Sequence, residues 1–291
     1  TGGGGGRVAV YYGDISGFDT ANIVAYGGTG RRGRGGAGTV FLKSPAQTYG
    51  ELIIDNSGIS GETPLRSVGS GVITGLTATA LTDENADFPV PNSETGALGL
   101  IGLELNPNIE QDRTFTIIAN TETTITIDAS DGDLTEIAQI GDRYVGVYFI
   151  DGLTLRGKVS VSTENNIAFA PGGILTVIDS VLEANNILGD DLEIDAVNGT
   201  IKLQERPSLD RLSMDNETLM ININGPLEVD EITLSNNSSL TFDGLLIANS
   251  LTLAEGSSLT HSGATTESIS RLELEIETLV IDESSAIDVS G

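Results

Sequence analysis

Apolar residues recur in a fixed template in the last part of the chain. The segment 246–261 repeats the segment 227–242 nineteen positions later, with the apolar residues in register. A third copy, 279–291, matches 251–263 at an offset of twenty-eight, because nine extra residues lie in the polar stretch between the copies. Apolar and polar residues alternate within each copy, which predicts strands and not helices. A fixed template with insertions only between copies is typical of stacked solenoid repeats.

The pattern changes along the chain and divides it into three zones. Residues 1–61 contain short alternating strands separated by glycine and polar turns, which predicts N-terminal repeats of the solenoid. Residues 62–150 contain longer strands and Asp-Gly and Gly-Asp turns, which predicts an inserted small antiparallel β domain. Residues 151–291 return to short strands and form the C-terminal repeats. The predicted fold class is therefore all-β, a parallel β-solenoid with one inserted domain.

Composition excludes several classes of function. The chain has 291 residues and a formal net charge of -28, so its surface repels nucleic acid and anionic membranes. It has no cysteine and one histidine, which excludes thiol chemistry, disulfide frameworks and histidine-rich metal sites. No apolar run approaches the roughly 18 residues of a membrane span. We therefore expect neither a nucleic-acid partner nor membrane insertion.

Four segments carry a resemblance to a known group of proteins. The glycine-rich segments 2–12, 35–43 and 50–56, followed by 115–155, resemble recurrent modules of very large bacterial surface proteins with adhesin-like repeats. The resemblance implies a right-handed parallel β-helix of the pectin-lyase-like architecture, secreted and located outside the cell or at the cell surface. It also implies a modular role in surface fibres or adhesion, and no activity follows from the fold alone.

The two ends of the sequence predict self-association. In proteins of this kind a strand such as 287–291 precedes a segment such as 2–12, so we expect this chain to be one unit of a head-to-tail array. A solenoid end exposes unpaired strand groups and an open core, and no polar or helical cap is predicted at either end. Such contacts need not close and can propagate into a filament. The residues expected in the contact are Gly2, Gly3, Arg7, Val8, Val10, Tyr12, Leu279, Ile281, Ile287 and Val289.

The glycine loop 33–38 matches the dinucleotide pattern G-x-G-x-x-G, but a strand follows it where a phosphate-binding helix is required, so we reject that function. Arg31, Arg32 and Arg34 form a basic cluster in this loop. Three interpretations stay open: a solvated turn, a salt contact with a neighbouring subunit, and a contact with an anionic glycan.

Two acidic turns are candidates for calcium. Asp128, Asp131 and Asp133 place three carboxylates in six residues, and Asp190 and Asp191 form a second group beside Glu193. Neither matches the twelve-residue EF-hand loop. The alternative is ordinary turn chemistry, in which Asp and Gly stabilise the bend.

The function that the sequence favours is a structural, self-associating subunit of an extracellular or cell-surface fibre. A glycan-binding adhesin module and a polysaccharide lyase or glycosidase remain the alternatives, because β-helices often carry such enzymes. An enzyme would use paired carboxylates, for which Asp210 and Asp215 are one example. His261 aligns with Phe242 and Val289, which predicts a packed, hydrogen-bonded side chain and not a catalytic one.

Overall fold

The computed structural model describes residues 2–30, 33–205, 207–223, 225–263 and 270–290, without the side chains of residues 33, 34 and 208. The chain is all-β, with 53% of its residues in strands and 3% in helices. Its long parallel sheets are compatible with a β-solenoid, as the sequence predicted. Contacts divide the chain into two compact units. Unit 1 comprises residues 1–63, 149–162 and 168–291, and unit 2 comprises 64–148 and 163–167.

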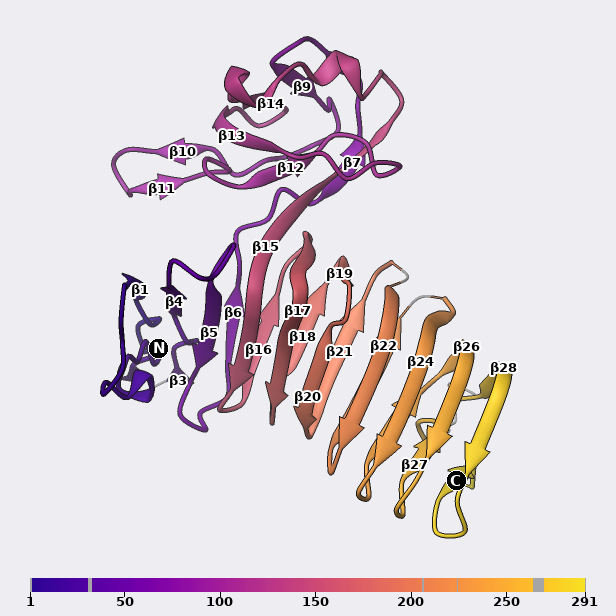
Figure 1. The fold of residues 1–291 in the computed structure, drawn as a ribbon. Coiled ribbons are helices and arrows are strands. Elements are labelled where there is room, and N and C mark those ends of the chain that lie inside the picture. Colours follow the sequence, from indigo (N-terminus) through magenta and orange to yellow (C-terminus); the bar gives the residue numbers. More distant parts are fainter. Residues whose placement is uncertain (1, 31–32, 206, 224, 264–269, 291) are drawn as a thin grey trace. The chain divides into compact units, whose positions relative to one another are not determined.

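Two parallel sheets make up most of unit 1 (Figure 1). Each of the last repeats contributes one long strand to the first sheet and one short strand to the second. The strands of the first sheet in unit 1 include β15 (Arg143–Arg156), β17 (Asn166–Ile178), β20 (Glu193–Val197), β22 (Ser208–Asp215), β24 (Leu227–Ser235), β26 (Gly244–Leu253) and β28 (Leu272–Ile281), with β19 (Asn186–Gly189) beside β22. The second sheet has the order β29 (Ala286–Asp288), β27 (Ser258–Thr260), β25 (Ser239–Phe242), β23 (Thr218–Ile223), β21 (Gly199–Leu203), β18 (Val181–Ala184), β16 (Val159–Ser162) and β6 (Gly61–Pro64).

The register of the last repeats is the one that the sequence template predicts. Leu227 pairs with Leu246 at an offset of nineteen, and Leu251 pairs with Leu279 at an offset of twenty-eight. Parallel in-register strands place equivalent side chains in columns, so the alternating apolar residues of successive repeats stack between the two sheets. Leu246, Leu251 and Leu259 are fully buried in this core. The predicted template is therefore confirmed at the level of single residue pairs.

Polar side chains also form a column, at the turn between the two sheets. The backbone N–H of Glu217 donates to Ser238 Oγ at 3.2 Å, that of Ser238 to Ser257 Oγ at 3.2 Å, and that of Ser257 to Ser285 Oγ at 3.1 Å. The hydroxyls of Ser238 and Ser257 in turn donate to backbone carbonyls at 2.6 Å. The buried turn therefore satisfies its polar groups from one repeat to the next.

The N-terminal strands depart from the parallel pattern expected for residues 1–61. β1 (Arg7–Tyr11) is parallel to β4 (Thr39–Lys43), but β4 is antiparallel to β5 (Glu51–Asp55). Because β5 is parallel to β15, β1 and β4 run against these two strands. The glycine-rich segments pack backbone against backbone here: a Cβ on Gly35 would lie 2.0 Å from the carbonyl oxygen of Gly3.

Two short elements complete the N-terminal part of unit 1. The 3₁₀ helix η1 (Thr20–Asn22) is capped by Asp19, which accepts from Ala21 N. The strands β2 (Thr29–Gly30) and β3 (Gly33–Arg34) form a two-residue antiparallel ladder.

Unit 2 is antiparallel, in agreement with the predicted character of the insert. Its core gathers Leu105, Phe115, Ile117, Ile125 and Tyr144 among its buried members. Its strands are β7 (Ser70–Val72), β8 (Gly75–Leu76), β9 (Ala80–Thr82), β10 (Pro91–Asn92), β11 (Ala97–Leu98), β12 (Glu104–Asn106), β13 (Phe115–Asn120) and β14 (Thr124–Ile127). Antiparallel ladders join β12 to β13, β13 to β14, β14 to β9 and β7 to β15. The 3₁₀ helices η2 (Ala129–Asp131) and η3 (Leu134–Glu136) follow β14.

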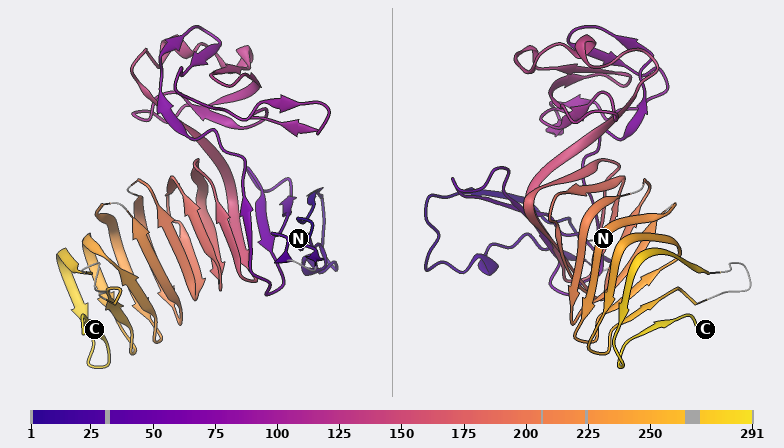
Figure 2. Two further views of the ribbon diagram at one scale, coloured as in Figure 1. Left: turned by 180° about the vertical axis from the view of Figure 1, so that it is seen from behind. Right: turned by 45° about the vertical axis from the view of Figure 1, so that its right-hand side comes forward.

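The boundaries of unit 2 differ slightly from the expected 62–150. Residues 163–167, which the sequence analysis placed in the C-terminal repeats, belong to unit 2. The reason is the buried side chain of Asn165, whose Oδ1 accepts from Val68 N at 2.8 Å and Gly69 N at 3.1 Å. A second view of the ribbon shows both units from behind and from the side (Figure 2).

Candidate assembly surfaces

Among the described residues, the repeat formed by β28 and β29 is more exposed than the repeats before it. Leu251 and Leu253 of β26 are 0% exposed, whereas their register partners Leu279 and Ile281 of β28 are 48% and 40% exposed. Val289 is also exposed, and Ile287 is half-buried. Among the described residues, the recorded ladders pair β28 with β26 and β29 with β27. The predicted contact residues at this end therefore form an uncovered apolar surface beside two strand edges.

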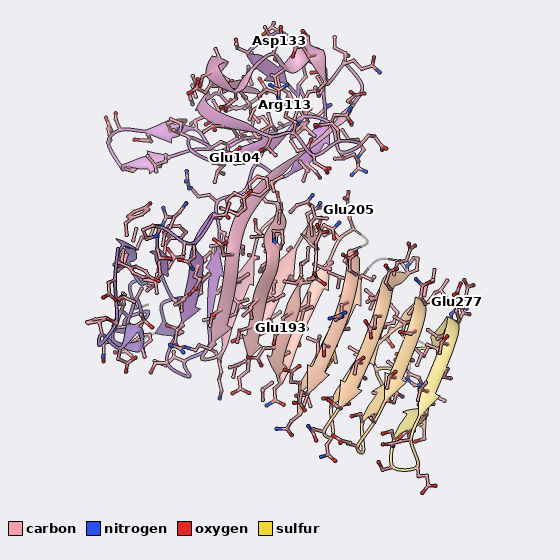
Figure 3. The ribbon with its side chains drawn as sticks, in the orientation of Figure 1. Glu104, Arg113, Asp133, Glu193, Glu205 and Glu277 are labelled. Carbon is pink, nitrogen blue, oxygen red and sulfur yellow. The ribbon has the colours of Figure 1, made fainter. Side chains whose placement is uncertain are left out.

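The outer face of β28 is acidic. Glu273, Glu275 and Glu277 alternate with Leu274 and Ile276 along the strand, and all three glutamates are exposed. Figure 3 shows Glu277 on this last strand of the first sheet. We call the residues 272–290 of this repeat the acidic end.

The other end of unit 1 is formed by β1 and the loops beside it. Val8 and Val10 are half-buried, Arg7 is exposed, and Tyr11 is 73% exposed while its ring lies 5.9 Å from that of Phe41. The described ladders give β1 one partner, β4. Residues 1–50 expose four aromatic side chains, which are Tyr11, Phe18, Tyr26 and Tyr49.

The glycines predicted at the N-terminal contact also pack against the backbone of their own chain. Gly3 accepts from Gly28 N at 2.8 Å, and a Cβ on Gly2 would lie 1.9 Å from the carbonyl oxygen of Gly28. Tyr12 is half-buried, and its backbone N–H donates to Lys43 O at 3.0 Å. Of the predicted N-terminal residues, Gly3 and Arg7 are exposed, and the others are half-buried.

Charge is distributed unevenly between the two ends. Residues 1–50 contain five Lys and Arg and two Asp, a formal charge of +3 in a chain of -28. Residues 270–291 contain one Arg and six Asp and Glu, a formal charge of -5. The excess of positive charge in residues 1–50 comes from Arg31, Arg32 and Arg34. Among the side chains that the structure describes in this segment, Arg7 and Lys43 balance Asp14 and Asp19.

The predicted basic cluster falls mostly outside the description. Arg31 and Arg32 lie outside the described residues, and for Arg34 the structure describes the backbone in β3 but not the side chain. The three interpretations of this cluster therefore remain predictions.

The first predicted calcium turn uses its carboxylates to bind the backbone. Asp128 accepts from Ser130 N at 2.9 Å, and Asp133 from Thr135 N at 2.8 Å. Asp131 Oδ2 accepts from Thr116 N at 2.7 Å, which is in β13. The backbone N–H of Ser130 holds the pKa of Asp128 below its usual value, and the hydroxyl of Thr135 does the same for the pKa of Asp133.

At the second turn, Asp190 and Asp191 are exposed, and Asp191 adopts a positive φ of 53°. In the part of the chain that the structure describes, no group of three or more His, Cys, Asp or Glu is placed to hold a metal ion. Calcium at either turn stays a prediction, and the geometry observed is that of turn chemistry.

His261 is half-buried and lies between repeats. Its Nδ1 is 2.6 Å from Ser262 O, and its Nε2 is 3.2 Å from Val289 O in the acidic end. The alignment placed His261 in the same column as Phe242 and Val289, and the ring bridges to the last of these. A hydrogen-bonded, structural histidine is the arrangement observed.

The sequence analysis missed one carboxyl with unusual surroundings, Glu217. One of its carboxylate oxygens is buried without a hydrogen-bond partner. Burial, and next the negative charge of Asp195, raise the pKa of Glu217 to about 8. The signal was present in the sequence, because Glu217 precedes β23 where serine precedes β25 and β27.

The carboxyl groups of Asp210 and Asp215, which were considered as a pair for an enzyme, are not buried in the way that the carboxyl of Glu217 is. Asp210 is exposed, and Asp215 accepts hydrogen bonds from Asn236 Nδ2 and Ser235 Oγ of the next repeat. These contacts fasten neighbouring repeats together.

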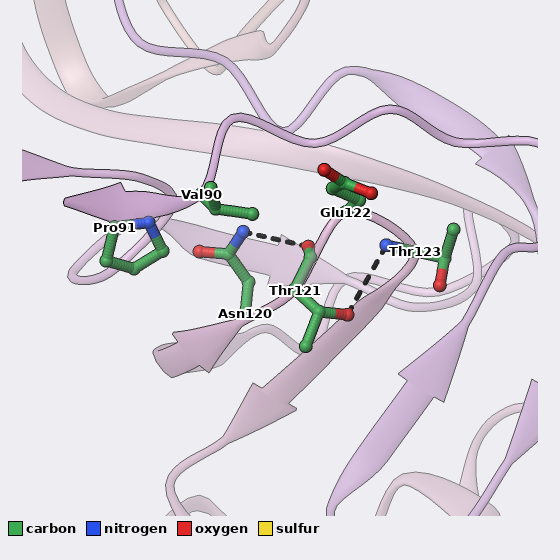
Figure 4. A pocket seen from close by; sticks show the side chains of 6 residues that line it. All are labelled: Val90, Pro91, Asn120, Thr121, Glu122 and Thr123. Carbon is green, nitrogen blue, oxygen red and sulfur yellow. Dashed lines mark hydrogen bonds between the residues drawn. The ribbon is translucent and has the colours of Figure 1, made fainter.

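Two pockets lie within unit 2. The first is shallow, about 480 Å³ in volume, and Figure 4 shows its lining by Val90, Pro91, Asn120, Thr121, Glu122 and Thr123. The second has a volume of about 410 Å³ and contains Asp83 and Tyr144. Tyr144 donates to Asp83 Oδ2 at 2.9 Å, and burial raises the pKa of Tyr144 above its usual value. Because Phe88 and Tyr144 are buried, neither offers an exposed face on which a sugar could stack.

Comparisons with known proteins give no relative. No family model, no curated protein and no solved structure matches this chain. Among the described residues, the structure has no helix long and apolar enough to cross a membrane.

Proposed function

We propose that this chain is a structural subunit of an extracellular or cell-surface fibre, which associates head-to-tail through the two ends of unit 1. In this proposal the stacked sheets form a right-handed parallel β-helix. The resemblance of the glycine-rich segments to adhesin-like surface modules supports the location and the handedness. The partner is a second copy of the same chain.

The observation that carries the proposal is the uncovered repeat β28–β29. The same template residues that are buried in β26 are about half-exposed in β28, so no described part of the chain closes the core over them. Fully burying an aliphatic side chain contributes about 1.5–3 kcal/mol, so covering the remaining half of Leu279 contributes about 1 kcal/mol. Natural sheets protect long edge strands or pair them, and β28 presents a ten-residue edge.

Concentration-dependent association tests the proposal. Sedimentation velocity over a range of concentrations, followed by negative-stain electron microscopy, should show linear oligomers that lengthen as concentration rises. Leu279→Asp should suppress them, because it places a charge on the apolar surface of the acidic end.

Ile174→Asp is the matched control, since Ile174 is a similarly exposed aliphatic residue of β17 away from both ends. It should leave association unchanged. Monomers at every concentration, or equal loss of association in both variants, would contradict the proposed function.

Glycan binding is the second candidate, and one observation favours it. The exposed aromatic residues Tyr11, Phe18 and Tyr26 lie in the net-positive segment, a combination that suits an anionic sugar. A glycan array that includes sulfated and uronic-acid sugars tests this candidate. Binding that Tyr11→Ala abolishes would support it.

A further inference from the structure

We propose that unit 2 binds a small organic cation, a diamine or polyamine whose ammonium groups are separated by methylenes. The site is the second pocket of unit 2, which contains Asp83 and Tyr144. It is lined by residues 67–72, 83, 85–89, 144 and 164, all of which belong to unit 2. We call it the carboxylate pocket. The proposal is independent of the proposed assembly, because it uses no residue of unit 1.

Glycines let polar groups lie directly against the backbone in the carboxylate pocket. A Cβ on Gly71 would lie 2.3 Å from Asp83 Oδ2 and 2.5 Å from the hydroxyl oxygen of Tyr144. A Cβ on Gly69 would lie 3.0 Å from Glu164 Oε2, and Gly69 has a positive φ of 75°. The segment 69–71 therefore has two carboxylates and a phenol close beside it, where larger residues would displace them.

Asp83 is a buried carboxylate that has only neutral donors. Its side chain is 4% exposed, and it accepts from Tyr144 Oη at 2.9 Å and from Asn85 N at 2.9 Å. The described lining of the pocket contains no Lys, Arg or His. Neutral donors satisfy two of the roughly four lone pairs of a carboxylate and leave its charge uncompensated. The charge that the pocket lacks is positive, and a cationic ligand supplies it.

Two further carboxylates lie in the same pocket. Asp87 and Glu164 are exposed, and among the described residues neither side chain has a recorded hydrogen bond or ion pair. Together with Asp83 they give the lining a formal charge of -3. A concave surface with charges of one sign concentrates counter-ions. The pocket therefore offers one buried and two accessible acceptors to a donor-rich cation.

The spacing of these carboxylates favours an organic cation over a metal ion. Calcium takes about six to eight oxygen ligands around one point. In the part of the chain that the structure describes, no three carboxylates are placed to hold one ion. Ammonium groups at the two ends of a carbon chain can instead reach carboxylates that lie apart.

The size and the apolar lining of the pocket fit such a chain. Its volume of about 410 Å³ lies within the range of about 300–1,000 Å³ of small-molecule sites. Val72, Phe88 and Pro89 line it beside the carboxylates, and Val72 is 46% exposed. Methylenes of a diamine can cover these apolar groups, which a hydrated inorganic cation would leave in contact with water.

Spermidine is the probe for the first experiment. It is titrated into the ¹⁵N-glycine-labelled chain at about 0.15 M salt, which screens general attraction to the acidic surface. The amide resonances of Gly69 and Gly71 should shift and saturate at one molecule per chain. Those of Gly132, which lies outside the pocket in unit 2, should stay in place. Shifts spread over all glycines without saturation would overturn the inference.

Two competing ligands define the chemical class. Calcium chloride should not displace spermidine, and acetyl-lysine amide, which has one ammonium group, should bind at least tenfold more weakly. Calcium that saturates the same amides at lower concentration would make the pocket a metal site and overturn the inference. Equal binding of the single ammonium group would overturn the assignment to a diamine or polyamine.

Substitutions of the carboxylates test the site itself. Asp87→Asn and Glu164→Gln should each weaken spermidine binding about two- to fivefold, since each removes one exposed charge. Asp83→Asn should weaken it about tenfold or more, because its charge is buried. If Asp83→Asn does not fold, the two exposed variants still test the proposal.

Glu122→Gln is the matched control. Glu122 is exposed, lies in unit 2 and lines the other pocket, so the variant makes the same charge change away from the carboxylate pocket. It should leave spermidine binding unchanged. Equal weakening by Glu122→Gln and Glu164→Gln would show that only the overall charge attracts the amine, and the inference would be wrong.

Discussion

Single residues in the turn column show how this chain tolerates a polar interior. Serine side chains accept the N–H of the preceding repeat, and Glu217 occupies the corresponding place before β23. A serine hydroxyl is neutral and satisfies its own proton on a backbone carbonyl. A glutamate there must either stay protonated or hold a buried charge near Asp195, and its pKa is raised first by burial and next by the negative charge of Asp195.

This carboxyl predicts a pH dependence of stability. The pKa of Glu217 rises from its ordinary value of 4.5 to about 8 in the folded chain, so the folded state binds a proton that the unfolded state releases. The stabilisation is fully present below pH 4.5 and is lost as pH rises towards 8. Glu217→Gln should remove this loss, and urea unfolding of both proteins across that interval measures the difference.

Glu275→Gln provides the control for this experiment, because Glu275 is exposed on β28. Its unfolding free energy should follow the parent chain at each pH. If Glu217→Gln also retains the slope of the parent between pH 4.5 and 8, the carboxyl does not carry a proton in the folded state.

At the scale of elements, identical template positions should differ in energy according to what covers them. Leu251→Ala should cost about 2–5 kcal/mol, because it opens a cavity in the closed core between β26 and its neighbours. Leu279→Ala at the equivalent place in β28 should cost about 1 kcal/mol or less in the monomer, since Leu279 is about half-exposed. Urea unfolding at a concentration below that of association measures both.

The comparison of Leu251→Ala with Leu279→Ala can also be made on the associated protein. Above the concentration of association, Leu279→Ala should acquire an additional cost, because the junction between copies then buries this side chain. Equal costs for the two variants in the monomer would mean that the last repeat is covered by another part of the chain.

The strands themselves were predictable to different degrees. The offsets of nineteen and twenty-eight followed from apolar alternation, since parallel in-register repeats keep equivalent residues in one column. The reversal of direction between β4 and β5 could not be predicted, because parallel and antiparallel strands show the same alternation of apolar and polar residues. Segment 163–167 was assigned to the repeats for a similar reason: a hydrogen bond from Val68 to a distant asparagine leaves no periodic signal.

The candidate contact residues divide in the same way. Leu279 and Ile281 were identified because the template marks core positions whatever covers them, and the structure leaves them exposed. Gly2 and Gly3 were assigned to the contact by their place in the sequence, which gave no sign of their close backbone packing with Gly28. Sequence predicts which residues face a core, and tertiary packing decides whether that core is closed.

For the whole molecule, the net charge of -28 makes two copies repel each other, whereas charges of opposite sign at the contact attract. Two copies repel as whole particles, but the Debye length is about 10 Å at 0.1 M salt, so only charges close to the junction act strongly there. The described charges there include Arg7 on β1 and the three glutamates of β28, Glu273, Glu275 and Glu277, and these attract. Between these two effects, proximity favours attraction at the junction.

Raising the salt concentration from about 0.1 M to about 0.5 M should therefore weaken association. Each exposed ion pair contributes roughly 0.2–1 kcal/mol, so screening a few of them raises the dissociation constant about three- to tenfold. Sedimentation equilibrium over this range measures the change. Arg7→Glu should reverse its sign, because screening then relieves a local repulsion at β1. If salt strengthens association of the parent chain instead, the overall charge governs the contact, and the charges at the junction do not select the partner.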